Sequence, residues 1–143
     1  MTTNNVPRED QEQAALIRWA QMQSGKYPDL ELLYHVPNEG KRSVIGGVKM
    51  QHQGLKKGVP DLCLPVPVGA YHGMYIELKR QSGSVPSPEQ VWWLDALSRN
   101  GYCVCWARGW EEARQAIMDY LKIGAIEYSP TKGRGGQYHA REV

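Results

Sequence analysis

Three charged residues in two otherwise apolar stretches are the strongest candidates for chemistry in this chain. Asp61 opens the apolar stretch 61–66. Glu77 and Lys79 lie two residues apart in the next apolar stretch, 72–79. The alternation of side chains along a strand places Glu77 and Lys79 on one face. Because an unpaired buried charge is unfavourable, these groups must pair with one another or bind a metal ion.

The spacing of the two acids predicts a specific chemistry. A hairpin joining the two stretches would place Asp61 and Glu77 side by side. Two adjacent carboxylates repel each other, and a hard divalent cation such as Mg²⁺ relieves that repulsion. Such a cation polarises a phosphoryl oxygen and makes water more acidic, while a neighbouring lysine stabilises negative charge in the transition state. The set therefore predicts metal-assisted phosphodiester hydrolysis, with a salt-bridged edge strand as the alternative.

Positive charge is concentrated around these residues. The whole chain carries a formal charge of +2, whereas segment 41–80 contains seven basic and two acidic residues. A localised positive surface favours a phosphate-bearing partner, because binding releases counterions. The alternative is an ordinary solvated loop. The candidate phosphate contacts, and hence the candidate DNA-binding residues, are Lys41, Arg42, Lys49, Lys56 and Lys57.

Apolar periodicity and the positions of glycine and proline predict an α/β arrangement. Helices are expected at about 8–23, 88–99 and 110–122, and strands at about 31–36, 61–66, 72–79 and 102–107. Pro7 suits the first position of the first helix. Ser87, Pro88 and Gln90 form a capping-box pattern at the start of the second helix. The order predicts a mixed β-sheet flanked by helices.

Two segments show no sustained periodicity of apolar residues. The connection 38–60 is rich in glycine, lysine and glutamine, and a helix is expected only at about 43–54. The tail from Gly124 has few core-forming residues, so we expect a flexible segment at 124–143. Residues 1–123 are then one domain, as expected for a chain of 143 residues.

Several other classes of protein are excluded by composition and motif. No stretch is long and apolar enough for a membrane span or a signal peptide, so a cytoplasmic protein is expected. Cys63, Cys103 and Cys105 are an odd number in apolar surroundings, which favours buried reduced thiols. No P-loop, Gly-rich dinucleotide motif or nucleophile elbow is present, so no nucleotide cofactor is expected.

The segments GVPDL, IELKR and SPEQ together resemble the motifs of the VRR-NUC domain, a branch of the PD-(D/E)XK nuclease superfamily. The resemblance covers about residues 9–121. It implies a restriction-endonuclease-like αβββαβ core and cleavage of DNA that depends on Mg²⁺ or Mn²⁺. It assigns Asp61 and Glu77 to the metal, and Lys79 to the catalytic centre. Gln90 matches the family's downstream glutamine, although its capping box explains it without an active site.

Members of this family also carry a glutamate in the first helix, and two residues fit that position. Glu12 lies on the same helix face as Leu16, which is expected to face the core, and is therefore the preferred candidate. Glu9 has the spacing to Gln13 that the family often shows. Both also fit an acidic first turn that complements the helix dipole. Both are kept as candidate metal ligands, with Glu12 as the catalytic one.

The resemblance also implies a substrate and an assembly. Short stand-alone members resemble homodimeric Holliday-junction resolvases, and this chain has no room for the extra domains of flap nucleases. We therefore expect a structure-selective DNA endonuclease that acts on branched DNA as a homodimer, in a bacterium or a phage-infected cell. The alternatives are a nuclease with a flap or nicking preference, and a non-catalytic nucleic-acid-binding module on the same fold.

Two further features leave alternatives open. His35 fits a strand histidine with a local hydrogen bond, or a general base. Trp92 and Trp93 follow Gln90, and one of them must face the core. The other is expected to pack in the core as well, in a dimer interface or on DNA.

Overall fold

A mixed β-sheet is the centre of the fold. The computed structural model describes residues 5–37, 44–122 and 137–139, and of 44–47 and 137–139 only the backbone. Within these residues the sheet order is β1-β2-β3-β4-β5, and only β3 and β4 pair in parallel. The strands are β1 (Tyr34–His35), β2 (Leu62–Leu64), β3 (Met74–Lys79), β4 (Cys103–Arg108) and β5 (Gln137–His139). The predicted mixed α/β class is confirmed.

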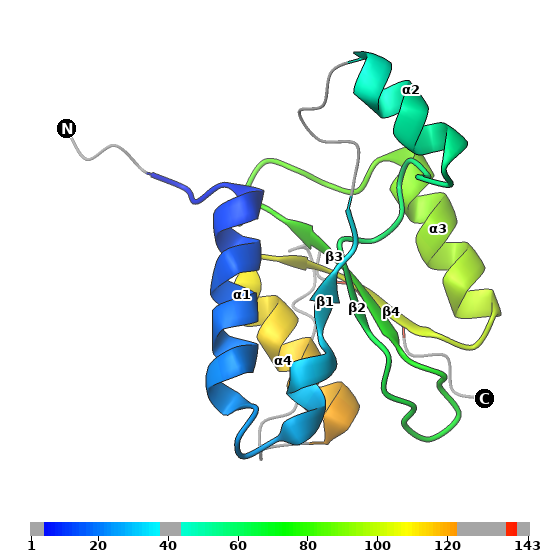
Figure 1. Cartoon of the computed structure of the whole chain (residues 1–143). Coiled ribbons are helices and arrows are strands. Elements are labelled where there is room, and N and C mark those ends of the chain that lie inside the picture. The colour runs from blue at the N-terminus through cyan, green and yellow to red at the C-terminus, as the bar shows by residue number, and fades with distance from the viewer. Residues whose placement is uncertain (1–4, 38–43, 123–136, 140–143) are drawn as a thin grey trace.

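Helices cover both faces of this sheet (Figure 1). α1 (Glu9–Gln23) and α4 (Trp110–Leu121) pack on one face, and α3 (Pro88–Arg99) packs on the other. The larger core lies under α1 and α4, where Leu16 and Ile117 meet β3. A smaller cluster under α3 contains Leu94 and Trp106. No helix in the described ranges has the length and apolar character that crossing a bilayer requires.

The alternation along β3 decides which face carries the candidate chemistry. Met74, Ile76 and Leu78 belong to the core under α1 and α4. Tyr75 packs on the smaller cluster under α3. Because side chains alternate, Glu77 and Lys79 share the face of Tyr75.

Most predicted elements are confirmed, and the differences have local causes. α2 (Val44–His52) lies in the expected helical part of the basic connection. The strand expected at 31–36 is wrong over most of its length, because a 3₁₀ helix, η1 (Pro28–Leu32), precedes the two residues of β1. Pro28 favours a helical start, and Leu30 and Leu33 are buried three residues apart, the spacing of a 3₁₀ turn.

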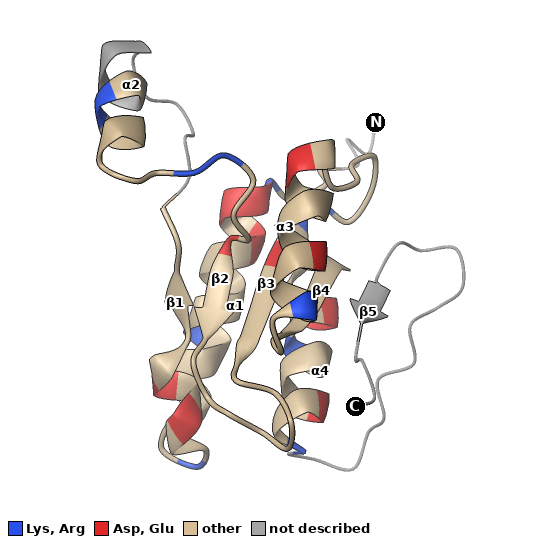
Figure 2. Cartoon of the chain, turned by 90° about the vertical axis from the view of Figure 1, so that its right-hand side faces the viewer, with Lys and Arg blue, Asp and Glu red and all other residues tan. Residues whose placement is uncertain are grey.

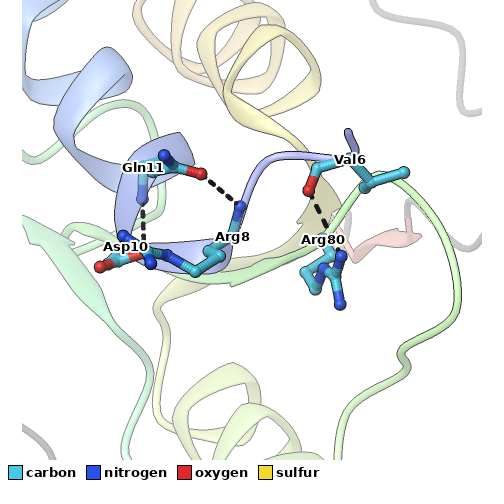
Figure 3. Close-up of polar contacts among 5 residues, drawn as sticks. All are labelled: Val6, Arg8, Asp10, Gln11 and Arg80. Atoms are coloured by element: carbon cyan, nitrogen blue, oxygen red, sulfur yellow. Dashed lines mark hydrogen bonds and ion pairs between the residues drawn. The ribbon is translucent and has the colours of Figure 1, made fainter. Parts of the chain in front are cut away.

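Both ends of the chain also differ from expectation. Pro7 does not open α1, because Arg8 is the residue before the helix and its backbone N–H donates to Gln11 Oε1 at 2.8 Å (Figure 3). In the tail, Gln137–His139 form β5, which pairs antiparallel with β4. This strand was not predicted, because the tail has few apolar residues. The other residues of the tail lie outside the described ranges.

The start of α3 holds the segment that enters β2. The predicted capping box is present: Ser87 Oγ accepts from the N–H of Gln90, and Gln90 Oε1 accepts from the N–H of Ser87. Gly58 has φ +91°, and a Cβ there would lie 2.7 Å from the backbone carbon of Glu89. Trp93 Nε1 donates to the carbonyl of Lys57 at 3.1 Å. These contacts fix where the chain enters β2.

Gly58 is therefore expected to be required for stability. In Gly58→Ala the positive φ becomes unfavourable and the new Cβ clashes with α3. We expect a loss of about 3 kcal/mol in the free energy of unfolding. Gly54→Ala is the matched control, because Gly54 has φ +105° with nothing within 4 Å of its Cβ position. It should lose about 1–2 kcal/mol. Urea unfolding measures both, and equal losses would show that the contact with α3 is unimportant.

Candidate active site

The β2–β3 hairpin brings the two acids of the candidate site together. Leu62 pairs with Ile76 in antiparallel register, so Asp61, just before β2, lies opposite Glu77 on the same face. Asp61 Oδ2 accepts the backbone N–H of Leu78 at 2.8 Å. This bond ties the carboxylate of Asp61 to the end of β3.

Both acids are harder to ionise than usual. Glu77 is 1% exposed, and burial together with repulsion from Asp61 raises its pKa to about 9. Burial also raises the pKa of Asp61, an effect that the N–H of Leu78 partly offsets. Glu77 Oε2 is buried and has no hydrogen-bond partner among the described residues. The protein therefore supplies too few donors and positive charges to stabilise both acids in their ionised forms.

Lys79 connects this pair to the first helix. Its Nζ lies 3.4 Å from Glu77 Oε1 and 3.4 Å from Glu9 Oε1. The side chain of Lys79 is 10% exposed, whereas that of Glu9 is 47% exposed. The stem of Lys79 is buried, and its Nζ contacts two acidic side chains at the edge of the site. Glu9 thus reaches the same site from the first turn of α1.

The two glutamates of α1 lie in different surroundings. Glu12 is 2% exposed, and its Oε2 accepts the N–H of Trp110 at 2.6 Å. Its Oε1 accepts from Gln81 Nε2 at 2.8 Å. Gly109 precedes α4 and has no side chain for a cap, so Glu12 supplies the cap from α1. The structure places Glu9 beside Lys79 and Glu12 at the start of α4.

The other candidates are spread around this centre. Gln90 is half-buried in the capping box of α3. His35 Nδ1 lies 3.2 Å from the carbonyl oxygen of Asp61, which is the local hydrogen bond expected of a strand histidine. Lys49, Lys56 and Lys57 are exposed on α2 and on the connection to β2, and Figure 2 shows a short blue stretch in that connection. Lys41 and Arg42 lie outside the described residues.

Two residues next to the site were missed by sequence reasoning. Arg80 Nη2 donates to the carbonyl of Val6 at 3.3 Å and links the end of β3 to the segment before α1 (Figure 3). Gln81 binds Glu12 from the same loop. Each contact joins residues about seventy positions apart, so no local pattern could have indicated it.

The residues present fit a hard divalent cation. Among the described residues no three His, Cys, Asp or Glu side chains converge as a full ligand set. Asp61 and Glu77 nevertheless provide two adjacent carboxylates, one with an unsatisfied buried oxygen. Mg²⁺ is typically bound through one or two carboxylates, with water and substrate phosphate as its other ligands. The two carboxylates and the unsatisfied oxygen of Glu77 match that pattern.

Comparison with known proteins identifies one family. The family model for the VRR-NUC domain matches residues 7–111. A solved structure described as a VRR_NUC domain protein is 30% identical to this chain, with a TM-score of 0.71. The match covers 84% of this chain and 93% of that chain. No curated protein matches the chain.

The raised pKa of Glu77 predicts how stability depends on pH. The folded chain keeps a proton that the unfolded chain releases above the ordinary pKa of 4.5, so stability falls as pH rises from there toward about 9. Glu77→Gln keeps the neutral shape and removes most of this fall. In EDTA at about pH 8.5, we expect it to be more stable than the wild type by about 5 kcal/mol, with little difference near pH 5. Thermal unfolding across this range tests it, and parallel curves for the two proteins would contradict it.

The two glutamates of α1 should differ in their effect on folding. Glu12→Ala leaves the N–H of Trp110 and the amide of Gln81 without their acceptor, and we expect a loss of about 2–3 kcal/mol. Glu9→Ala removes one exposed partner of Lys79, for which we expect a loss below about 1 kcal/mol. Chemical unfolding in EDTA measures both variants. A larger loss for Glu9→Ala would contradict these placements.

Proposed function

The chain belongs to the VRR-NUC domain family, whose members are generally nucleases, and we propose that it is a metal-dependent, structure-selective DNA endonuclease. One observation carries the proposal: a buried carboxylate oxygen of Glu77 without a partner, next to Asp61 and within reach of Lys79. Most buried polar atoms are hydrogen-bonded, so an unsatisfied carboxylate oxygen beside a second acid is a suitable ligand for a cation. The same residues match the family's Asp and Glu-x-Lys motifs.

Asp61 and Glu77 would hold Mg²⁺ or Mn²⁺, and Glu9, which contacts the same Lys79 as Glu77, is the proposed acid of α1 in this site. The cation, when bound, neutralises charge at the scissile phosphate and increases the acidity of water. The pair must release its protons to become a ligand, so loading is favoured as pH rises. Glu12, the glutamate preferred from the sequence, is instead proposed to hold the start of α4 against α1, because its two oxygens accept hydrogen bonds from Trp110 and Gln81.

Lys79 is the group of this chain best placed to act on the phosphate. Its ammonium is held between Glu77 and Glu9, so its position is fixed before substrate arrives. A fixed cation stabilises the negative charge that develops on the phosphoryl oxygens, without reorganisation during the reaction. Gln90 is proposed to contribute by anchoring the start of α3.

Exposed lysines near the site supply the contacts to DNA. Lys49, Lys56 and Lys57 lie on α2 and on the connection that leads into Asp61. Contacts to phosphate position a nucleic acid without reading its sequence. We propose these three residues, together with Lys41 and Arg42, as the phosphate-binding set.

We further propose that the chain acts as a homodimer on branched DNA, in the manner of a Holliday-junction resolvase. The support is the similarity to the short members of the family. A two-fold dimer presents two identical sites, which suits a substrate with two symmetric strands to cut.

Cleavage of labelled DNA tests the proposed activity. The panel is a four-way junction, a 5′ flap, a 3′ flap, a duplex and a single strand, each with Mg²⁺, Mn²⁺ or EDTA. Asp61→Asn and Lys79→Met should each lose at least about 100-fold in rate, because each removes charge stabilisation of the transition state. Glu111→Gln removes an exposed acid on α4 and is the matched control.

Each outcome of this panel decides between the alternatives. Paired symmetric cuts in the junction, abolished by EDTA and in both site variants, support the resolvase. Cleavage of flaps alone would keep the active site and overturn the resolvase. Salt-sensitive binding without cleavage, unchanged in both variants, would indicate a non-catalytic binding module instead.

A further inference from the structure

An exposed tryptophan lies on the first turns of α3, next to the proposed site. Trp92 is 59% exposed, although tryptophan is usually well buried. Its ring meets that of Trp93 edge to face, with centroids 5.6 Å apart. Trp93 is in turn held by the hydrogen bond from its Nε1 to the carbonyl of Lys57. The exposed ring therefore stands on a fixed support.

A hollow lies beside this ring. It has a volume of about 340 Å³ and is lined by Lys57, Pro88, Glu89, Trp92 and Trp93. A second hollow of about 440 Å³ also includes Trp93 in its lining, together with Lys56 and Met50 of α2. Both hollows have an aromatic wall and a lysine at the rim.

Each hollow has one lysine in its lining that can contact a phosphate. Lys56 and Lys57 are exposed there. Glu89, the acid that lines the smaller hollow, lies 3.7 Å from the Nζ of Lys57, so its charge is partly balanced. An aromatic ring beside lysines is the arrangement by which proteins bind single-stranded nucleic acid, with the base on the ring and the phosphate on the cation.

The hollow is also close to the proposed catalytic centre. Lys57 lies four residues before Asp61, so their Cα atoms are at most about 14 Å apart. Glu89 immediately precedes Gln90 in the capping box of α3. A base on Trp92 would therefore belong to a nucleotide near the scissile phosphate.

We propose that Trp92 is a stacking platform for an unpaired nucleobase of the DNA substrate, with Lys56 and Lys57 on the flanking phosphates. The inference rests on the proposed nuclease function. It adds a physical reason why the enzyme would select one DNA structure over another. Bases inside a duplex are covered on both faces by their neighbours. A base in a flap, gap or single-stranded extension presents a free face to the indole ring, so this contact favours DNA with unpaired bases.

Equilibrium binding without cleavage tests the platform. The probes are a labelled blunt duplex and the same duplex with a single-stranded extension, measured by fluorescence anisotropy in EDTA. Stacking on an aromatic ring contributes about 1–3 kcal/mol per base, so Trp92→Ala should lower the preference for the extended DNA about tenfold. Trp92→Phe should keep most of the preference. Val91→Ala is the matched control, because Val91 is the 46% exposed neighbour on the same helix.

The outcomes separate this inference from the proposed function. A wild-type chain that binds and cuts no DNA would overturn the proposed function. A wild-type preference for extended DNA that Trp92→Ala leaves unchanged would overturn the stacking platform alone. An unchanged preference, with a dimer that Trp92→Ala converts to a monomer by light scattering, would also overturn it and assign this face to a second copy. Thermal unfolding of Trp92→Ala checks that the exposed substitution leaves the fold intact.

Discussion

The packing of the buried carboxyl group of Glu77 beside the half-buried Asp61 is the constraint on which the rest of this structure depends. Asp61 and Glu77 lie at the open end of a hairpin, where burial and mutual repulsion disfavour their charged forms. The protein offsets this cost only in part, with one backbone N–H and the ammonium of Lys79. One oxygen of Glu77 stays without a partner among the described residues. Such an arrangement persists only if the surrounding fold is stable enough to hold it, and it is useful because a cation can complete it.

The elements around the pair are tied to each other close to the site. Glu12 joins α1 to the start of α4, and the N–H of Gly109 donates to the carbonyl of Lys79 at 2.9 Å. On the opposite face, Gly58 packs against the first turn of α3 and fixes the chain just before Asp61. These contacts place α1, β3, α3 and α4 around one end of the sheet (Figure 1). The proposed catalytic groups therefore belong to regular elements or lie directly beside them, which restricts their motion and preorganises their charges.

The sequence predicted those parts of the structure that depend on local pattern. The capping box at Ser87 and Gln90 and the hairpin that joins Asp61 to Glu77 are both present. The strand expected at 31–36 is present only at Tyr34–His35, because so short an apolar run does not distinguish a strand from the end of the 3₁₀ helix at Pro28–Leu32. The separate surroundings of Glu9 and Glu12 could not be predicted, since both lie in the first turns of one helix. What separates them is Trp110, almost a hundred residues away in sequence, whose N–H binds Glu12.

Binding of Mn²⁺ to the purified chain tests the central claim most directly, because it needs no assumption about the DNA substrate. Electron paramagnetic resonance of free Mn²⁺ gives the number of bound ions and their affinity, for the wild type and for variants that neutralise one acid. The account predicts saturable binding that weakens at least about tenfold in Asp61→Asn and in Glu77→Gln, because each removes a charged ligand. Glu111→Gln, which neutralises an exposed acid of α4, is expected to bind like the wild type. Equal binding by all four proteins, or none by the wild type, would show that the buried acid pair is not a metal site.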